Sequence, residues 1–381
     1  MIGIYQSWAS QERFILSASF LIESMKNTSN KTIWIILPIV LLFLLSCAST
    51  HKEKTESRDA DFYIKRGNAY HEKGQYDQAI LDYNKALEIN PKDALAYYHQ
   101  GVSYEKKGQY DQAISNYTKA LEINPRDTGA YYNRGMAYGN KGQYDHAILD
   151  YTKALEFNPR FTEAYNNRGV AYMAKGQYDR AISDHTMAIE LNPNNAEYYC
   201  NRAISFSMRG QYDQAISDCN KALEINPRHA DPYIERGLAY TGKGQYDRAI
   251  SDFNKALDID PKYDKAYYNR GIAYVKKGQL DQAISDFTKA LEINPRLAVA
   301  YYNRGIAYGK KGQYDQAISD FNKALEINPR YAEAYYSRGV AYYFKREYRE
   351  SWKDVEKAQS LGHQIDPKFL DKLRRASGRQ N

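Results

Sequence analysis

Cysteine, tryptophan and proline are scarce in this 381-residue sequence, at three, three and eleven residues. The three cysteines, Cys47, Cys200 and Cys219, are too few for the disulfide framework of a small secreted domain. Lysine and arginine number 53 against 46 aspartates and glutamates, and the two signs are interspersed along the chain rather than gathered in blocks. Because a dedicated nucleic-acid surface clusters its positive charge, nucleic acid is not expected as a partner.

Signature motifs of catalysis are also missing. The sequence contains no GxxxxGK[ST], HExxH, GxSxG or CxxC motif. Its seven histidines are scattered, and no two share a metal-ligand spacing on one expected helix. We therefore expect no enzyme activity, no cofactor, no metal site and no small-molecule substrate.

The few prolines that are present follow a strict period. Eight of them, from Pro91 and Pro125 to Pro329, lie 34 residues apart. A fixed period of this length is typical of a repeat architecture. Registering the chain on it gives nine repeats, here numbered 1 to 9 with positions 1 to 34 in each: residues 60–93, 94–127, 128–161, 162–195, 196–229, 230–263, 264–297, 298–331 and 332–365.

Small and aromatic residues recur at the same positions of every repeat. Position 4 is Tyr and position 27 is Ala throughout, while position 8 is Gly and position 11 is Tyr with one exception each. Positions 4, 8 and 11 share one face of a first helix, and positions 20, 24 and 27 share one face of a second. The Gly of KGQYD and the Pro of INPR end these helices. Each repeat is therefore predicted to be a helix–turn–helix unit.

This pattern resembles the tetratricopeptide repeat (TPR) family, in which position 24 is aromatic and position 32 is Pro. The resemblance covers residues 60 to about 365 and implies an all-α fold, a right-handed α-solenoid superhelix of nine helix–turn–helix TPR units. Residues 366–376 are expected to form a C-terminal capping helix, followed by a tail at 377–381. The resemblance also implies a non-catalytic protein–protein interaction scaffold, whose unidentified protein or peptide ligand lies in a concave groove lined by the first helices.

Two columns of side chains are candidates for contact with that ligand. Position 6 is Asn in five repeats: Asn133, Asn167, Asn201, Asn269 and Asn303. An amide carries a donor and an acceptor, so such a column can pair with an extended peptide backbone. It resembles the asparagine ladder in the repeat domain of O-linked N-acetylglucosamine transferase. We expect tyrosines at position 5 to add specificity: Tyr98, Tyr132, Tyr268 and Tyr302. The alternative is that duplication simply copied the sequence YYNRG.

Position 7 departs from the family, which usually has Leu there. It is Arg in eight repeats and Gln100 in repeat 2. We expect the stem of each Arg to cover the Tyr rings while its head reaches outward. Aspartates recur at positions 18 and 23, so one Arg–Asp pair per repeat would fix the stacking register. The alternative interpretation is a groove that faces anions, either acidic peptides or nucleic acid.

Position 24 varies in three repeats. His185, Cys219 and Val355 replace the aromatic residue, and we expect looser packing of the helix pairs there. Cys200 lies in the same repeat as Cys219, and whether the two form a disulfide is left open.

The first 59 residues lie outside the repeats and look like a bacterial lipoprotein leader. Ile33 to Leu45 is an apolar run that is short for a membrane span and is followed by small residues, as in a secretory signal. Leu44-Leu45-Ser46-Cys47 looks like a lipobox, which implies lipidation of Cys47. The expected segments are an over-called upstream stretch at 1–24, a signal peptide at 25–46 and a polar tether at 47–59.

This leader predicts a lipid-anchored protein of the bacterial cell envelope. We expect the outer membrane, with the repeats facing the periplasm, and a role in envelope or secretion assembly; an uncleaved inner-membrane anchor is the alternative. If the leader is not used, the chain would instead be a soluble intracellular adaptor or an RNA-binding protein.

Overall fold

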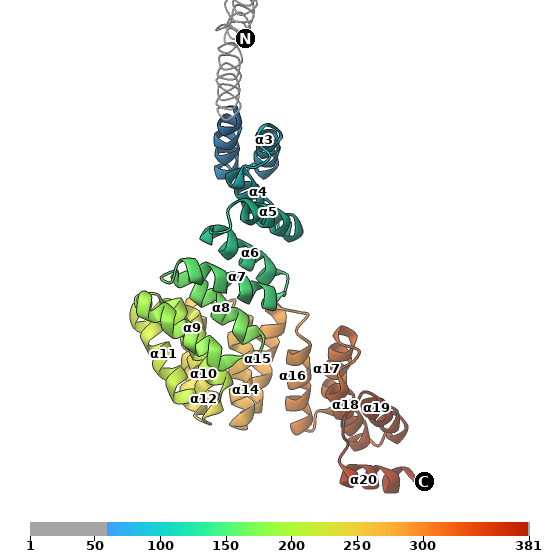
Figure 1. Ribbon diagram of the computed structural model, residues 1–381. Coiled ribbons are helices and arrows are strands. Elements are labelled where there is room, and N and C mark those ends of the chain that lie inside the picture. Colours follow the sequence, from blue (N-terminus) through green and yellow to red (C-terminus); the bar gives the residue numbers. More distant parts are fainter. Residues whose placement is uncertain (1–58, 380–381) are drawn as a thin grey trace, which may run out of the picture. The chain divides into compact units, whose positions relative to one another are not determined.

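The nine predicted helix pairs set the architecture of residues 59–379, which a computed structural model describes (Figure 1). The chain divides into two compact blocks, residues 59–137 and 138–379. The first helices of the repeats are residues 59–72, α4 (Ala94–Lys106), α6 (Thr128–Asn140), α8 (Thr162–Ala174), α10 (Ala196–Met208), α12 (Ala230–Gly242), α14 (Asp264–Lys276), α16 (Ala298–Lys310) and α18 (Ala332–Phe344).

Each repeat also contributes one second helix. They are α3 (Tyr76–Ile89), α5 (Tyr110–Ile123), α7 (Tyr144–Phe157), α9 (Tyr178–Leu191), α11 (Tyr212–Ile225), α13 (Tyr246–Ile259), α15 (Leu280–Ile293), α17 (Tyr314–Ile327) and α19 (Tyr348–Ser360). A last helix, α20 (Pro367–Ser377), follows them. No strand occurs within residues 59–379. The predicted all-α fold of stacked helix pairs is thereby confirmed.

A left-handed glycine joins the two helices in eight of the nine repeats. The glycine at position 15 has a φ between 70° and 76° in repeats 1 to 8, for example Gly74 and Gly312. Side chains with a Cβ rarely adopt this conformation, which explains the glycine of the KGQYD motif. In repeat 9 Arg346 takes the same place with a φ of 64°.

Close approach of the two helices explains the glycine at position 8. A Cβ added to Gly101 would lie 2.7 Å from Cε1 of Tyr117, the ring at position 24 of the same repeat. In repeat 5 the ring is replaced by Cys219, and position 8 is Ala203 instead of Gly, with both side chains fully buried. The smaller residue at position 24 thus makes room for the larger one at position 8, so the predicted loose packing is offset there.

The C-terminal helix α20 covers the end of the array. The Asp366 side chain accepts a hydrogen bond from the Lys368 backbone N–H at 2.9 Å, and Pro367 occupies the first turn. Leu373 is fully buried in a cluster with Val355 of α19. This is the capping helix that the sequence predicts, because a repeat stack needs a terminal element to shield its last apolar face.

The amino-terminal leader lies outside the described residues, and so do Cys47 and the expected tether at 47–58. None of the helices within residues 59–379 has the length and apolar character that crossing a membrane requires.

Candidate binding groove

The side chains predicted to contact a ligand lie on the first helices, and all of them are partly buried. They are Tyr98, Tyr132, Asn133, Asn167, Asn201, Tyr268, Asn269, Tyr302 and Asn303. Partial burial lets these side chains pack against one another and still expose a polar edge to solvent.

Several position-6 amides bind the preceding repeat. In the first block, Asn133 donates from Nδ2 to the Tyr98 hydroxyl at 2.9 Å. In the second block, Asn303 donates to the Tyr268 hydroxyl at 3.1 Å. Each bond spans 35 residues, so it joins position 6 of one repeat to position 5 of the repeat before it. These amides therefore brace neighbouring first helices against each other.

The same bond changes where position 5 changes. Asn201 donates to Oδ1 of Asn166, which replaces Tyr at position 5 of repeat 4, at 2.9 Å. Asn166 in turn donates to Asn167 at 3.3 Å. Asn269 faces repeat 6, whose position 5 is Ile234, and it makes no hydrogen bond within residues 138–379. Whether a position-6 amide forms this hydrogen bond therefore depends on whether position 5 of the preceding repeat supplies an acceptor.

The tyrosines at position 5 pack on the ring at position 24 of their own repeat. Tyr98 and Tyr117 have ring centroids 5.9 Å apart, as do Tyr302 and Phe321. Burial raises the pKa of the Tyr98 phenol, which stays protonated at neutral pH. Asn303 also donates to the Val299 backbone carbonyl at 2.8 Å, so its side-chain oxygen is the group that remains for a ligand. The peptide-binding role of the two columns stays a prediction.

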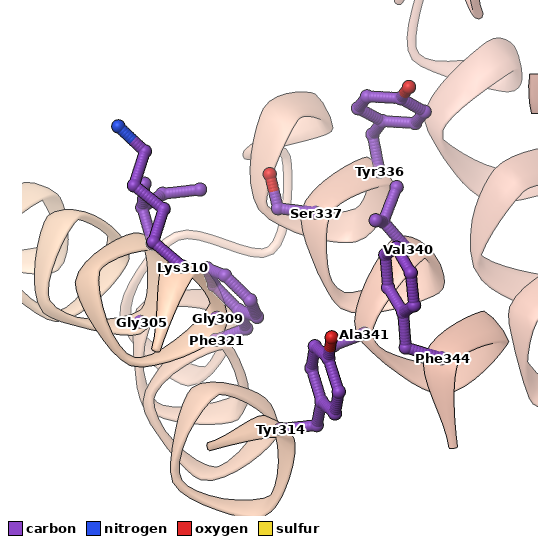
Figure 2. Close-up of a pocket in the computed structure, with 11 residues that line it drawn as sticks. Gly305, Gly309, Lys310, Tyr314, Phe321, Tyr336, Ser337, Val340, Ala341 and Phe344 are labelled. Atoms are coloured by element: carbon purple, nitrogen blue, oxygen red, sulfur yellow. The ribbon is translucent and has the colours of Figure 1, made fainter. Parts of the chain in front are cut away.

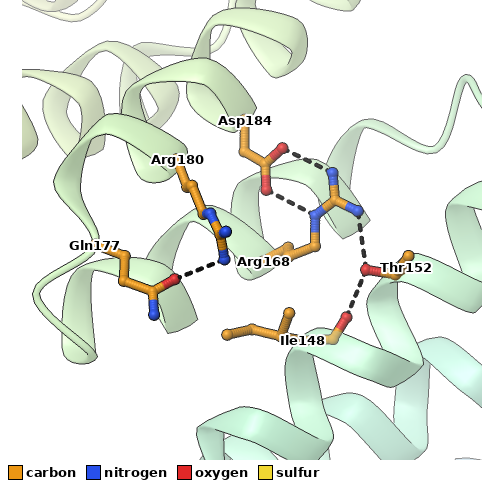
Figure 3. A network of polar contacts seen from close by, with 6 residues as sticks. All are labelled: Ile148, Thr152, Arg168, Gln177, Arg180 and Asp184. Carbon is orange, nitrogen blue, oxygen red and sulfur yellow. Dashed lines mark hydrogen bonds and ion pairs between the residues drawn. The ribbon is translucent and has the colours of Figure 1, made fainter.

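A buried ion pair joins the two helices of repeat 4, as Figure 3 shows. Arg168 donates from Nε and Nη2 to the two oxygens of Asp184, at 2.7 and 2.8 Å. Its Nη1 donates to the Thr152 hydroxyl of repeat 3 at 3.0 Å. The guanidinium lies over the Tyr165 ring, 5.5 Å from its centroid. One arginine therefore joins both helices of its own repeat and the second helix of the preceding one.

This Arg–Asp rung recurs through the array. It is formed by Arg66–Asp82, Arg168–Asp184, Arg202–Asp218, Arg236–Asp252, Arg270–Asp286, Arg304–Asp320 and Arg338–Asp354. Each of these aspartates is 5% exposed or less. The predicted pairing with position 23 is confirmed. The expectation that the head reaches outward is wrong, because the guanidinium turns inward to this buried carboxylate.

The aspartates at position 18 serve a different contact. They pair with a lysine or arginine at position 14 of the next repeat, as in Asp247 with Lys277, and Asp315 with Lys345 at 2.7 Å. The Asp247 side chain is 85% exposed, so these pairs are solvated surface contacts between repeats. Position 18 is therefore not a partner of the position-7 arginine.

Repeat 2 replaces the rung with a neutral pair. Gln100 stands at position 7 and Asn116 at position 23, and both are buried. Gln100 donates to Oδ1 of Asn84 in repeat 1 at 2.7 Å, the contact to the preceding repeat that arginine makes elsewhere. Losing the cation and the anion together leaves no buried charge without a partner.

The two cysteines of repeat 5 are free and buried. Burial raises the pKa of the Cys200 thiol to about 12 and raises that of Cys219 as well. Both therefore remain thiols at neutral pH, the less reactive form. In the next repeat, burial and the nearby charge of Asp231 raise the pKa of the Glu235 carboxyl to about 7.

A pocket opens between α16 and α18 of repeats 8 and 9, and α17 contributes Tyr314 and Phe321 to its lining (Figure 2). Its volume is about 340 Å³. The apolar wall includes Ile306, Phe321, Val340 and the stacked rings of Tyr314 and Phe344, whose centroids are 5.1 Å apart. We call this cavity the repeat 8–9 pocket.

The repeat 8–9 pocket was not predicted from the sequence. It lies at Gly309, position 12 of repeat 8, a register that varies from repeat to repeat. Variation at position 12 was the one signal in the sequence that pointed to this place. It does not distinguish a position that opens a binding cavity from one that simply faces solvent. Within residues 59–379, no group of three or more histidine, cysteine or acidic side chains is placed to hold a metal ion.

A stack of 34-residue helix pairs with a cavity on its first helices defines a helical-repeat binding scaffold. The tetratricopeptide repeat model matches residues 94–127, 129–161, 162–195, 196–229, 264–297 and 298–331, more than half of the chain. Further TPR matches cover 67–108, 219–251 and 237–278. The chain belongs to the tetratricopeptide repeat family.

Solved structures agree with this fold. A tetratricopeptide repeat protein from Parabacteroides merdae ATCC 43184 is similar, with a TM-score of 0.55, 24% identity and coverage of 66% of this chain and 99% of that one. The APC/C hetero-tetramer Cut9–Hcn1 has a TM-score of 0.55 at 17% identity, covering 83% of this chain and 76% of its own. At these identities the likeness shows the fold alone. No curated protein matches the chain.

Proposed function

We propose that the chain is a membrane-tethered scaffold that holds a peptide segment of a partner protein in the groove of its first helices. Its TPR repeats support the broader role, protein–protein interaction. The observation that carries the groove is the repeat 8–9 pocket, a cavity with an apolar wall that opens between two first helices. Such a cavity is the usual form of a site that anchors a side chain.

Exposed apolar side chains supply further contact area on the first helices. Val170 is 40% exposed and Met208 is 60% exposed. An exposed apolar side chain costs free energy in water and gains it when a partner covers it. The second helices provide a matched comparison in Leu149 and Met187, which are 64% and 36% exposed.

Capture with two matched double variants tests the groove. Val170→Glu with Met208→Glu places charges on the first helices, and Leu149→Glu with Met187→Glu places the same charges on the second helices. Envelope proteins retained by the wild type should be lost with the first pair and kept with the second. Equal retention by both variants, with helicity unchanged by circular dichroism, would contradict groove binding.

The lipid anchor is a separate part of the proposal. The lipobox-like stretch ending at Cys47 supports it, and processing of that kind attaches more than one acyl chain, which stable membrane binding requires. Labelling cells with a radioactive fatty acid should mark the wild type and leave a Cys47→Ser variant unmarked. An unlabelled wild type found in the soluble fraction would favour an intracellular adaptor instead.

A further inference from the structure

Gly309 creates the repeat 8–9 pocket, and the packing of the fold does not require a glycine there. Gly305, one turn earlier, is required, because an added Cβ would lie 2.7 Å from Cε1 of Phe321. A Cβ on Gly309 would meet only the Ala317 Cβ, at 4.0 Å. Glycine inside a helix weakens it relative to alanine. Repeat 7 has Val275 in the same register, so a side chain is compatible with this position.

The residue at position 24 leaves additional space. In repeat 2 the Tyr117 hydroxyl reaches the groove side and bonds Glu105, the residue at position 12, at 2.8 Å. Repeat 8 has Phe321 at position 24, which has no hydroxyl, and Gly309 at position 12, which has no side chain. Both changes empty the same place. The result is a cavity whose floor is an aromatic ring.

The chemistry of the repeat 8–9 pocket is divided between its floor and its rim. Aromatic and aliphatic side chains form the wall, and Figure 2 shows the polar ends of Lys310, Ser337 and Tyr336 on the side away from the Tyr314 ring. At about 340 Å³ the cavity is at the lower end of the range for ligand sites. It therefore suits a single large apolar side chain with its polar backbone at the rim.

Lys310 adds a charge that nothing in its own block neutralises. The adjacent Lys311 pairs with Asp281, and Lys323 pairs with Glu326 at 2.8 Å. Lys310 forms no ion pair within residues 138–379, and neither does Lys276, which has the same register one repeat earlier. A rim that carries the unpaired Lys310 is complementary to a carboxylate.

We propose that the repeat 8–9 pocket binds one aromatic or long aliphatic side chain of a partner peptide, and that Lys310 pairs with a carboxylate on the neighbouring residue. This assignment rests on the proposed function and names the peptide chemistry that the groove selects. The apolar side chain fills the space over Phe321, and the acidic group lies at the rim. Peptides with a basic residue beside the apolar one are disfavoured by repulsion from Lys310.

Dipeptide probes test the pocket without knowledge of the partner. N-acetyl-Phe-Asp-amide, N-acetyl-Phe-Lys-amide and N-acetyl-Ala-Asp-amide are titrated into the purified protein, with the Ile306 and Val340 methyl groups followed by NMR. The Phe-Asp probe should shift both methyl signals in a saturable way. At low salt it should bind about three- to tenfold more tightly than Phe-Lys. The Ala-Asp probe should leave the signals unchanged.

Three variants distinguish the pocket from general surface binding. Gly309→Val fills the cavity and should abolish the shifts. Gly139→Val is the matched control, because Gly139 is the position-12 glycine of repeat 3 and an added Cβ there meets only the Tyr151 hydroxyl at 3.9 Å; it should change nothing. Lys310→Gln should keep Phe-Asp binding but reduce its preference over Phe-Lys to within about twofold.

The outcomes separate this inference from the proposed function. Saturable Phe-Asp binding that Gly309→Val removes and Gly139→Val preserves supports the pocket. Methyl signals that do not respond, or equal binding of all three probes, overturn it, whereas groove binding stands if the Val170/Met208 variant still loses captured proteins. If the Phe-Asp probe binds but the Val170/Met208 and Leu149/Met187 variants capture the same proteins equally well, the pocket stands and the proposed function fails.

Discussion

Removing one charge of an Arg–Asp rung should destabilise the array by more than the loss of two hydrogen bonds alone, because the other charge is left buried without its partner. In repeat 7, Asp286 is 5% exposed and accepts two bonds of 2.7 Å from Arg270. The change Asp286→Asn leaves that guanidinium without its anion. Breaking a buried pair in this way costs about 3–5 kcal/mol. Because the Arg270 side chain stays 18% exposed, water offsets part of the loss, and we expect about 2–3 kcal/mol.

Neutralising both partners should recover much of that loss. The double variant Arg270→Gln with Asp286→Asn recreates the pair found in repeat 2, Gln100 with Asn116. The new glutamine can donate to Asn254 of the preceding repeat, which Arg270 contacts at 2.6 Å. Two residues that share one network are not additive, and we expect a coupling energy of about 1–2 kcal/mol.

Urea unfolding of the wild type, the two single variants and the double variant measures this coupling. Because long repeat arrays do not always unfold in one step, hydrogen exchange of α14 and α15 is followed as well. Asp247→Asn is the control: it removes an exposed pair with Lys277 and should cost less than about 1 kcal/mol. If the four free energies add, or if Asp286→Asn costs no more than Asp247→Asn, the rung is not a buried structural pair.

Three further predictions concern single positions. His185→Phe should raise the free energy of unfolding by about 1–2 kcal/mol at pH 7, because both buried ring nitrogens of His185 have no partner within residues 59–379. Burial lowers the pKa of His185 to about 3, so the unfolded state takes up a proton first as the pH falls below about 6.5; urea midpoints should show the advantage of the variant growing from pH 7 to pH 5. Glu235→Gln should show the opposite trend, because its thermal midpoint should rise relative to that of the wild type as the pH rises. The Glu235 pKa is about 7 in the folded state and about 4.5 in the unfolded state, so the wild type loses on the order of 2 kcal/mol of stability between these two pH values. Gly305→Ala should destabilise by about 1–3 kcal/mol through its clash with Phe321, and Gly309→Ala should stabilise by about 0.5–1 kcal/mol; melting temperatures that move in the same direction would contradict this contrast.

Most of the fold could be predicted from the sequence because it is periodic and local. The glycine at position 15 and the proline at position 32 end the helices, and the small residues at positions 8, 20 and 27 mark the packed faces. A helix pair closes within 34 residues, so its contacts repeat at fixed separations. The partner of the position-7 arginine was only half predicted, because positions 18 and 23 both carry aspartate and only the helix crossing decides which one lies opposite.

The candidate site was harder to predict because it depends on contacts between repeats. The bond from Asn133 to Tyr98 spans 35 residues, so a position and its neighbour in the preceding repeat must be compared together. The ring hydroxyl and the amide were both named as candidates for a ligand, and the structure shows that they also bind each other. The repeat 8–9 pocket arises from an absent side chain and an absent hydroxyl, which no pattern of residue types displays.

Departures from the repeat pattern fall into two kinds, and the difference bears on where a partner binds. Ala203 accompanies Cys219, and Gln100 accompanies Asn116, so a change on one helix is matched by a change on the other. Matched changes are what packing demands, because an unmatched one leaves a clash or a buried charge. Gly309 is different, since no neighbouring side chain grows to fill the space it leaves. Gly309, next to the unpaired Lys310, lowers the stability of its helix, and no contact inside the array compensates for that loss. A ligand side chain that enters the space would supply the missing contact.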